Sequence, residues 1–357
     1  MTCFLGIYMT RVALAAFISI ILMVAQATEN MKLRTIKTIV KAIERPEGAG
    51  ATVRRSIGVG QMRKFNPFLM FDHFSSAGTN GFPHHPHLGQ ETITLITKGA
   101  MAHEDFTGSK GILYAGDLQF MTAGRGIVHS EMPVQQEDGS PTVGLQLWVD
   151  LPQQLKETEP RYRDLREWEV PQVVEQDGKL KVKVISGKSY GVESVKDLAY
   201  TPVQYYHVTM KPGAKFEQDL PEDYNFFLYV MEGDGLVLNE NSPVGQFDNA
   251  FLNRDGNHIS GENTGQNDVE FILIGGEILD QHTVHYGPFV ASNTPRIEKA
   301  FADFQYGRNG FENVKTWNSL ISEGVTKEMI EGELDGNLEK REKTRQAYLQ
   351  RNAKDEL

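Results

Sequence analysis

Two pairs of potential metal ligands stand out in the sequence, His85 with His87 and His129 with Glu131. Within each pair the residues are two positions apart, so on a β-strand both side chains point to the same face, about 7 Å apart along the strand. If both strands face one interior, three imidazoles and one carboxylate can converge on a single ion. This donor set suits iron, manganese, nickel, copper or zinc. Four protein ligands also leave one or two positions open, as a catalytic metal requires.

A single His-x-His is more often a surface or packing feature than a metal site. Here a second pair follows in another strand-like run, and glycine and proline punctuate both runs as they do at turns. A barrel built from hairpins would bring such pairs together. Four nearby polar residues are interpreted as packing residues or supports of the site, and not as ligands: His73, His103, Glu104 and Asp105.

The elements that must position these pairs are β-strands. The segment TITLIT at 92–97 is rich in β-branched residues, residues 142–151 alternate between apolar and polar types, and strand-like runs resume after residue 172. The predicted organisation is a signal peptide at 1–27, an N-terminal metal-binding barrel at 33–152, a linker at 153–172, a C-terminal barrel at 173–292 and a helical tail at 293–357.

An internal repeat links the two predicted barrels. The segment TLITKG, which ends at Gly99, resembles LYVMEG, which ends at Gly233, at an offset of 134 residues. At this offset the positions of His85 and His87 are occupied by Asp219 and Pro221, so the second copy lacks the imidazoles. The sequence therefore predicts one metal site, in the first barrel.

The composition limits the possible functions. The chain has 357 residues, enough for two domains, 40% hydrophobic residues and a net charge of −11. This charge argues against direct binding of nucleic acid phosphates. The single cysteine, Cys3, lies in the N-terminal apolar stretch, so the mature chain has no disulfide framework.

Both ends of the chain resemble targeting signals. Arg11 is the only charge in residues 1–27, an apolar run covers 12–25, and Ala25-Gln26-Ala27 fits a cleavage site, as in a signal peptide. The chain ends in KDEL, the retention sequence of the endoplasmic reticulum. We therefore expect a lumenal protein that meets the KDEL receptor and has no membrane span after cleavage. Initiation at Met31 would instead give a cytoplasmic or nuclear protein.

Several motifs, in this order, closely resemble the pirin family: HPHLGQETIT, AHEDF, GDLQFMTAGRGIVHSEMP, GLQLWVDLP, GGE, HYGPFV and GRNGF. The resemblance covers roughly residues 33–322. It implies an all-β protein with two tandem cupin (jelly-roll) barrels and short C-terminal helices. It also implies a single iron ion, Fe(II), in the N-terminal barrel, with other divalent metals as alternatives, held by four ligands: His85, His87, His129 and Glu131. Glu91 is then a neighbour of the site and not a ligand.

The resemblance implies two activities. The first is quercetin 2,3-dioxygenase activity, which cleaves a flavonol-like substrate with O₂ and in which Glu131 would be the catalytic base. The second is an iron-redox-responsive binding protein, a transcriptional co-regulator without turnover. A metal-bearing barrel without chemistry is a third possibility, and the family suggests a monomer. The chain departs from many pirins at Leu88, where they have arginine, so a positive charge beside the metal is lost.

Overall fold

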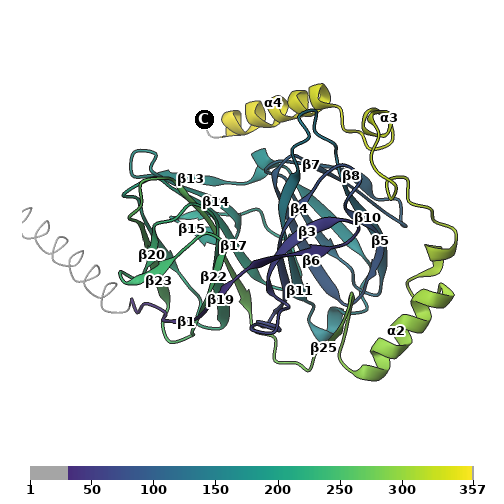
Figure 1. Ribbon diagram of the computed structural model, residues 1–357, viewed down its shortest axis with the longest axis horizontal. Helices are drawn as coiled ribbons and strands as arrows, with labels where there is room; N and C mark the ends of the chain where they lie inside the picture. The colour runs from purple at the N-terminus through teal and green to yellow at the C-terminus, as the bar shows by residue number, and fades with distance from the viewer. Residues whose placement is uncertain (1–30, 356–357) are drawn as a thin grey trace, which may run out of the picture.

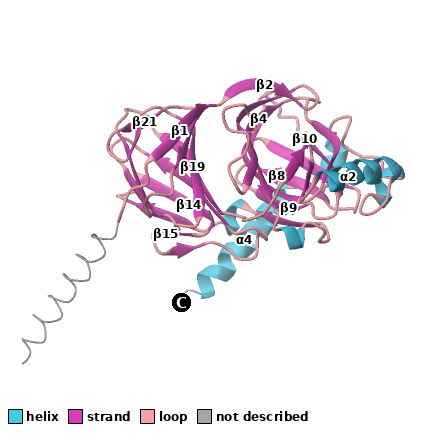
Figure 2. Ribbon diagram, turned by 90° about the horizontal axis from the view of Figure 1, so that it is seen from below, coloured by secondary structure: helices cyan, strands magenta, loops and turns pink. Residues whose placement is uncertain are grey.

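The computed structural model describes residues 31–355 as two β-barrels that lie side by side (Figure 1). Each barrel consists of one seven-stranded and one four-stranded sheet. Strands dominate the described chain, and its α-helices are confined to the C-terminal part (Figure 2). This agrees with the predicted pair of cupin barrels. The expected signal peptide at 1–27 and the last two residues of the KDEL sequence lie outside the described residues.

The first barrel carries both predicted ligand pairs. Its seven-stranded sheet has the order β12 (Arg161–Leu165), β9 (Leu118–Thr122), β6 (Gln90–Lys98), β11 (Thr142–Asp150), β4 (Phe68–Ser76), β3 (Ala51–Ile57) and β2 (Ile43–Glu47). Its four-stranded sheet has the order β5 (Phe82–His87), β10 (Ile127–Pro133), β7 (Ala100–Asp105) and β8 (Lys110–Tyr114).

The second barrel repeats this arrangement. Its seven-stranded sheet has the order β1 (Ile36–Lys41), β22 (Asp248–Leu252), β19 (Tyr224–Glu232), β24 (Val269–Glu277), β17 (Val203–Met210), β14 (Leu180–Ser186) and β13 (Gln172–Glu175). Its four-stranded sheet has the order β18 (Lys215–Asp219), β23 (His258–Asn263), β20 (Leu236–Leu238) and β21 (Ser242–Val244). Strands β6 and β19, which carry the repeated segments, occupy equivalent positions in the two sheets.

The expected domain boundaries need correction. Strand β1 pairs with β22 of the second barrel, so the first barrel does not begin at residue 33. The supposed linker at 153–172 contains β12, which pairs with β9 and covers an edge of the first barrel. An unpaired sheet edge can pair with another chain and aggregate. In each barrel a strand from outside the predicted boundary pairs with such an edge: β12 with β9 in the first barrel and β1 with β22 in the second. Such pairings join residues far apart in sequence, so local patterns did not reveal them.

The two seven-stranded sheets pack against each other through one apolar core. Phe68 and Phe71 of the first sheet meet Phe227 and Tyr229 of the second, with ring centroids 5.2 Å apart for Phe68–Phe227 and for Phe71–Tyr229. Leu69 and Met70, which lie between Phe68 and Phe71, line the cavity of the first barrel, and Leu228, between Phe227 and Tyr229, belongs to the interior of the second. The same strands therefore hold the barrels together and line their interiors.

The interiors of the two barrels differ in chemistry. On β19, Phe226 and Leu228 belong to a closely packed apolar interior. At the offset of 134, the corresponding residues of β6 are Thr92 and Thr94, which are also buried. The smaller polar side chains leave the first barrel less filled by apolar atoms. The first barrel can therefore hold a site, whereas the second is filled by its own side chains.

Short elements complete the structure. They comprise the hairpins β15 (Lys188–Ser189) with β16 (Val192–Glu193) and β25 (Val284–Tyr286) with β26 (Phe289–Ala291), the 3-10 helices at Gln153–Leu155, Glu167–Glu169 and Glu312–Lys315, and the helices α2 (Thr294–Tyr306), α3 (Lys327–Glu331) and α4 (Leu338–Asp355). Helix α2 flanks the first barrel, and α4 runs along the top of the molecule in Figure 1.

Helix α4 is attached near its N-terminal end. Both terminal nitrogens of Arg341 donate to the buried carboxylate of Asp117, each at 2.8 Å.

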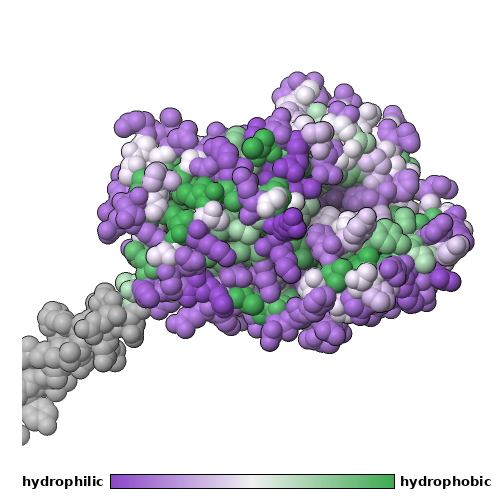
Figure 3. Space-filling view, turned by 60° about the horizontal axis from the view of Figure 1, so that its bottom comes forward, coloured by the Kyte–Doolittle hydropathy of each residue, from purple (hydrophilic) through white to green (hydrophobic). Residues whose placement is uncertain are grey.

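Hydrophilic side chains cover much of the face seen in Figure 3, with apolar patches between them. No helix within residues 31–355 is long and apolar enough to span a membrane.

Candidate metal centre

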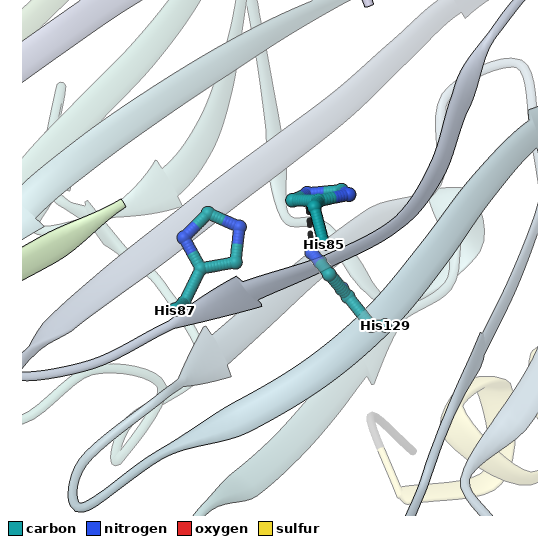
Figure 4. Close-up of side chains that lie close together, drawn as sticks. All are labelled: His85, His87 and His129. Carbon is teal, nitrogen blue, oxygen red and sulfur yellow. Dashed lines mark hydrogen bonds between the residues drawn. The ribbon is translucent and has the colours of Figure 1, made fainter. Parts of the chain in front are cut away.

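Three of the predicted ligands come together in the first barrel. His85 and His87 lie on β5, and His129 lies opposite His85 on the antiparallel strand β10. One ring nitrogen from each histidine can be chosen so that all three atoms lie within 4.8 Å of one another. The rings converge from the two strands (Figure 4). The spacing of two residues on β5 thus places both imidazoles on one face, as the sequence predicts.

Glu131 lies at the edge of this group. The β5–β10 pairing shifts its register between His129 and Glu131, and Glu131 Oε2 lies 3.9 Å from His129 Nε2. Glu131 is not a member of the close three-histidine cluster. Its role as a fourth ligand stays a prediction. A small movement of this carboxylate toward a bound ion would make Glu131 a ligand.

The environment of Glu131 favours its neutral form. Burial raises the pKa of this carboxyl to about 7, against the opposing effects of His103 and of hydrogen bonds from Gln146 and Thr94. Gln146 Nε2 donates to Glu131 Oε2 at 3.2 Å. A carboxyl group with a pKa near neutrality can both release and accept a proton.

The hydrogen bonds of the histidines leave ring nitrogens available for a metal. His85 Nδ1 donates to the carbonyl oxygen of Pro83 at 2.8 Å, so His85 Nε2 keeps its lone pair. His87 Nδ1 lies 2.7 Å from the side-chain amide of Gln90. The atom that faces this ring in the structure is the amide nitrogen, Gln90 Nε2. With the amide turned so that its oxygen faces the ring instead, His87 Nδ1 would donate and His87 Nε2 would be free. This orientation also gives a partner to Gln90 Oε1, which otherwise has none among the described residues.

The three histidines fit a divalent metal. Burial lowers the pKa of His85, His87 and His129, so their rings are neutral at pH 7. His87 Nε2 is buried without a partner within residues 31–355, and such a polar atom is costly unless it binds something. Neutral imidazoles fixed by hydrogen bonds at the opposite nitrogen are the usual protein ligands of first-row transition metals.

The centre opens into a cavity of about 480 Å³. The His87 ring packs against Trp148, with centroids 4.9 Å apart. Apolar side chains line much of the cavity, among them Val53, Leu69, Met70, Phe74, Phe82 and Met101. The size and lining suit a small aromatic molecule.

The C-terminal hairpin β25–β26 forms one wall of this cavity. His285, Gly287 and Pro288 line it, although they follow the second barrel in the chain. The backbones of Leu88 and Val290 hold the hairpin in place, because Val290 N donates to Leu88 O at 2.9 Å. Leu88 is 1% exposed and packs with Phe289. Leu88 is thus a packing residue beneath this hairpin.

The other singled-out residues have structural partners. Glu91 is buried and accepts hydrogen bonds from Thr122 Oγ1 at 2.7 Å and from the backbone nitrogen of Thr201 at 3.0 Å. It anchors the segment that leads into β17 of the second barrel and lies outside the three-histidine cluster. His73 Nδ1 lies 3.0 Å from the hydroxyl of Tyr229, across the interface between the barrels.

The motif at His103, Glu104 and Asp105 also supports the fold. The His103 ring stacks on Tyr162 with centroids 6.2 Å apart. Glu104 accepts from the backbone nitrogen of Ile321 at 3.2 Å, and Asp105 accepts from the backbone nitrogens of the turn that follows it. This agrees with the interpretation of these residues as structural or supporting.

Sequence reasoning missed three residues that contact the predicted ligands: Gln90, Gln146 and Trp148. They lie within the family-like motifs HPHLGQETIT and GLQLWVDLP, but their residue types gave no sign that they contact the ligands. The internal repeat carries a usable signal, because Thr94, the hydrogen-bond partner of Gln146 at 2.8 Å, stands where the second barrel has Leu228. A polar residue in place of a core leucine indicates a specialised interior.

Comparisons with known proteins agree with this architecture. A sequence profile described as Pirin matches residues 50–149, and one described as Pirin C-terminal cupin domain matches residues 205–310. The chain is 42% identical over 286 residues to a pirin-like protein of Solanum lycopersicum, covering 80% of this chain and 96% of the relative. It is also 42% identical over 281 residues to pirin of Homo sapiens, covering 78% and 94%.

A solved structure extends the comparison. The crystal structure of quercetin 2,3-dioxygenase from Acinetobacter baumannii matches with a TM-score of 0.72 at 26% sequence identity, covering 77% of this chain and 98% of that chain. Both barrels match the family profiles, and the similarity to curated relatives extends over 80% of the chain. The chain therefore belongs to the pirin family of two-barrel cupin proteins.

Proposed function

We propose that the chain is a metal-dependent dioxygenase of the quercetin 2,3-dioxygenase type, which cleaves a flavonol-like substrate with O₂ in the first barrel. The observation that carries this proposal is a cluster of three neutral histidines, two of which, His85 and His87, line a largely apolar cavity of about 480 Å³. A cavity that combines apolar walls with a metal site favours a planar aromatic substrate. The fold similarity to a quercetin 2,3-dioxygenase supports the same reaction class.

Bound Fe(II), or another divalent metal in its place, would supply Lewis acidity and a meeting point for substrate and O₂. His85, His87 and His129 would hold it, with Glu131 as the proposed fourth ligand. Glu131 also lines the cavity. It would accept the proton of the flavonol hydroxyl when it is held loosely enough to exchange between the metal and the substrate.

Two other residues would prepare the reaction. Gln146 orients the Glu131 carboxyl through its side-chain amide. Trp148 offers an aromatic surface beside His87. The hairpin β25–β26 would exclude water from this side of the cavity, which strengthens every polar interaction inside it.

The test is O₂ uptake by the purified chain, loaded anaerobically with Fe(II) and mixed with quercetin. Iron-dependent uptake that is lost in His87→Ala and kept in His84→Ala would support the proposal, because His84 is an exposed neighbour outside the cluster. Iron binding without O₂ uptake, across a panel of flavonols, would contradict it and favour the iron-redox-responsive binding protein.

The role of Glu131 has its own test. Glu131→Gln should retain some iron and lose turnover, because the amide cannot accept the substrate proton. Near-normal turnover in an iron-loaded variant would remove Glu131 from the role of base.

We further propose that the protein resides in the lumen of the endoplasmic reticulum. The support comes from the sequence of 1–27 and the terminal KDEL. A fluorescent protein inserted in an exposed loop, such as the one around Gly139, would leave both ends intact. A reticular signal is expected, and a nuclear or cytoplasmic signal would favour initiation at Met31.

A further inference from the structure

A row of polar side chains crosses the inner side of the first barrel. It takes one residue from each of four neighbouring strands, and each is the register partner of the next: Arg55 on β3, Asp72 on β4, Gln146 on β11 and Thr94 on β6. Arg55 Nε and Nη2 donate to the two carboxylate oxygens of Asp72, each at 2.7 Å. Thr94 Oγ1 donates to Gln146 Oε1 at 2.8 Å.

The second barrel has no such row. In the second barrel, strands β14, β17, β24 and β19 take the places of β3, β4, β11 and β6. The residues paired across these four strands are three aliphatic residues and one aromatic residue: Val184, Tyr206, Leu273 and Leu228. All four are buried in the apolar interior. Apolar residues thus suffice for a barrel of this topology. Polar groups in an interior cost free energy unless they are paired, so the row indicates a role other than folding.

The row connects the metal centre with the opposite wall of the cavity. Gln146 donates to Glu131 at one end. Arg55 and Asp72 line the same cavity at the other end, together with Glu47 of β2. Strands β11 and β3 are separated by β4, so their backbones are about 10 Å apart. A ligand with two or three rings can span this distance.

The charges at the far wall favour a hydroxyl donor over an anion. Arg55 Nη2 also donates to Glu47 Oε2 at 2.8 Å, so one guanidinium serves two carboxylates. Glu47 Oε1 accepts no hydrogen bond from the described residues, and the Glu47 side chain is 39% exposed. An excess of carboxylate oxygen repels anions and accepts hydrogen bonds from neutral hydroxyl groups.

The wall near the metal offers the complementary group. Trp148 lines the cavity beside His87, and its indole Nε1 is buried without a hydrogen-bond partner within residues 31–355. An indole nitrogen can only donate. The cavity thus presents a donor at the metal end and acceptors at the far end.

We propose that Glu47 and Asp72, held by Arg55, form a subsite that recognises hydroxyl groups on the outer ring of an aromatic ligand whose other end faces the metal. The ligand class is a neutral, planar polyphenol with a hydrogen-bond acceptor at one end and ring hydroxyl groups about 10 Å away. This proposal deepens the proposed function, because it rests on the cavity being the substrate site.

The test compares two flavonols: quercetin, which has two hydroxyl groups on its pendant ring, and galangin, which has none there. Their affinities are measured anaerobically by calorimetry on the metal-loaded full chain, so that no turnover occurs. Quercetin should bind at least about tenfold more tightly, because hydrogen bonds to a charged acceptor are strong. In Glu47→Met this preference should fall to within about twofold, with galangin affinity unchanged.

A matched control lies on the same hairpin. Glu44 of β2 accepts from Arg54 Nη2 of β3 at 2.8 Å, as Glu47 accepts from Arg55, but Glu44 does not line the cavity. Glu44→Met should leave both affinities unchanged. Metal content shows that each variant is folded, and Asp72→Asn, which keeps the side-chain shape, provides a second perturbation of the subsite.

The outcomes separate this subsite from the proposed function. A Glu47-dependent preference without O₂ uptake by the iron-loaded chain would support the subsite and contradict the dioxygenase. If the wild type and Glu47→Met both consume the two flavonols, and the KM for each flavonol is the same in the two proteins, the dioxygenase is supported and the subsite is overturned. Equal affinities in the wild type, or binding of neither flavonol, would also overturn the subsite.

Discussion

The Nε2 atoms of His85 and His129 lie 3.0 Å apart across the paired strands β5 and β10. His85 Nδ1 donates to a backbone carbonyl, so the Nε2 lone pair of His85 faces His129. Two such nitrogens at this distance need a proton or a cation between them. The backbone pairing thus presents a site that is already assembled for a metal.

Removal of one of these nitrogens should strongly weaken metal binding. His129→Ala is expected to reduce the affinity for Fe(II) or Ni(II) by more than about 100-fold, since even the loss of a ligand's hydrogen-bond partner costs 10–100-fold. Metal titration by calorimetry measures the change. His84→Ala, on the exposed side of β5, should bind normally, and stoichiometric binding by His129→Ala would disprove the three-histidine centre.

Gln90 should tune the metal affinity without binding the metal. Gln90→Leu removes the partner of His87 Nδ1 and is expected to weaken metal binding by about 10–100-fold. Gln218→Leu is the control, because Gln218 is also buried but belongs to the second barrel, where it donates to the backbone oxygen of Lys188 at 3.1 Å. Equal metal affinities for the two variants would show that Gln90 does not position His87.

The hairpin β25–β26 should be needed to close the cavity. Phe289 is 1% exposed and packs against Phe301, with ring centroids 4.8 Å apart. Phe289→Ala should lower the free energy of unfolding by about 3–5 kcal/mol and weaken flavonol binding more than metal binding. Denaturant unfolding and calorimetry measure both effects. Tyr286→Ala, on the same hairpin but 66% exposed, should change stability little.

The interface between the barrels should weaken in acid. Burial, aided by the positive charges of Arg54 and Lys98, lowers the pKa of His73 to about 4, whereas an unfolded histidine has a pKa of about 6.5. Below pH 6.5 the unfolded chain therefore binds the proton more readily. The stabilisation by neutral His73 is complete above pH 6.5 and is lost as the pH falls toward 4.

The expected loss at pH 5 is at most about 2 kcal/mol, reduced by the partial exposure of His73. Denaturant midpoints at pH 7 and pH 5 measure it. In His73→Gln, which keeps a partner for the Tyr229 hydroxyl, the midpoint should fall less between these two pH values. The same fall in both proteins would assign the acid sensitivity to other groups.

Local patterns in the sequence were sufficient to find the histidines. The spacing of two residues encodes a shared strand face wherever a β-strand forms, so His85 with His87 and His129 with Glu131 could be recognised without a structure. The repeat from TLITKG to LYVMEG likewise predicted two similar barrels, because each copy carries its own alternation of inward and outward residues.

The sequence therefore determined the barrel class, the duplication and the histidines of the centre. Only the tertiary structure decided that β1 joins the second barrel, that the hairpin after the second barrel walls the cavity of the first, and that Arg55, Asp72, Gln146 and Thr94 form one row. Strand pairing and register depend on contacts between residues far apart in the chain. A local pattern fixes the face on which a side chain lies, and not the strand that will lie beside it.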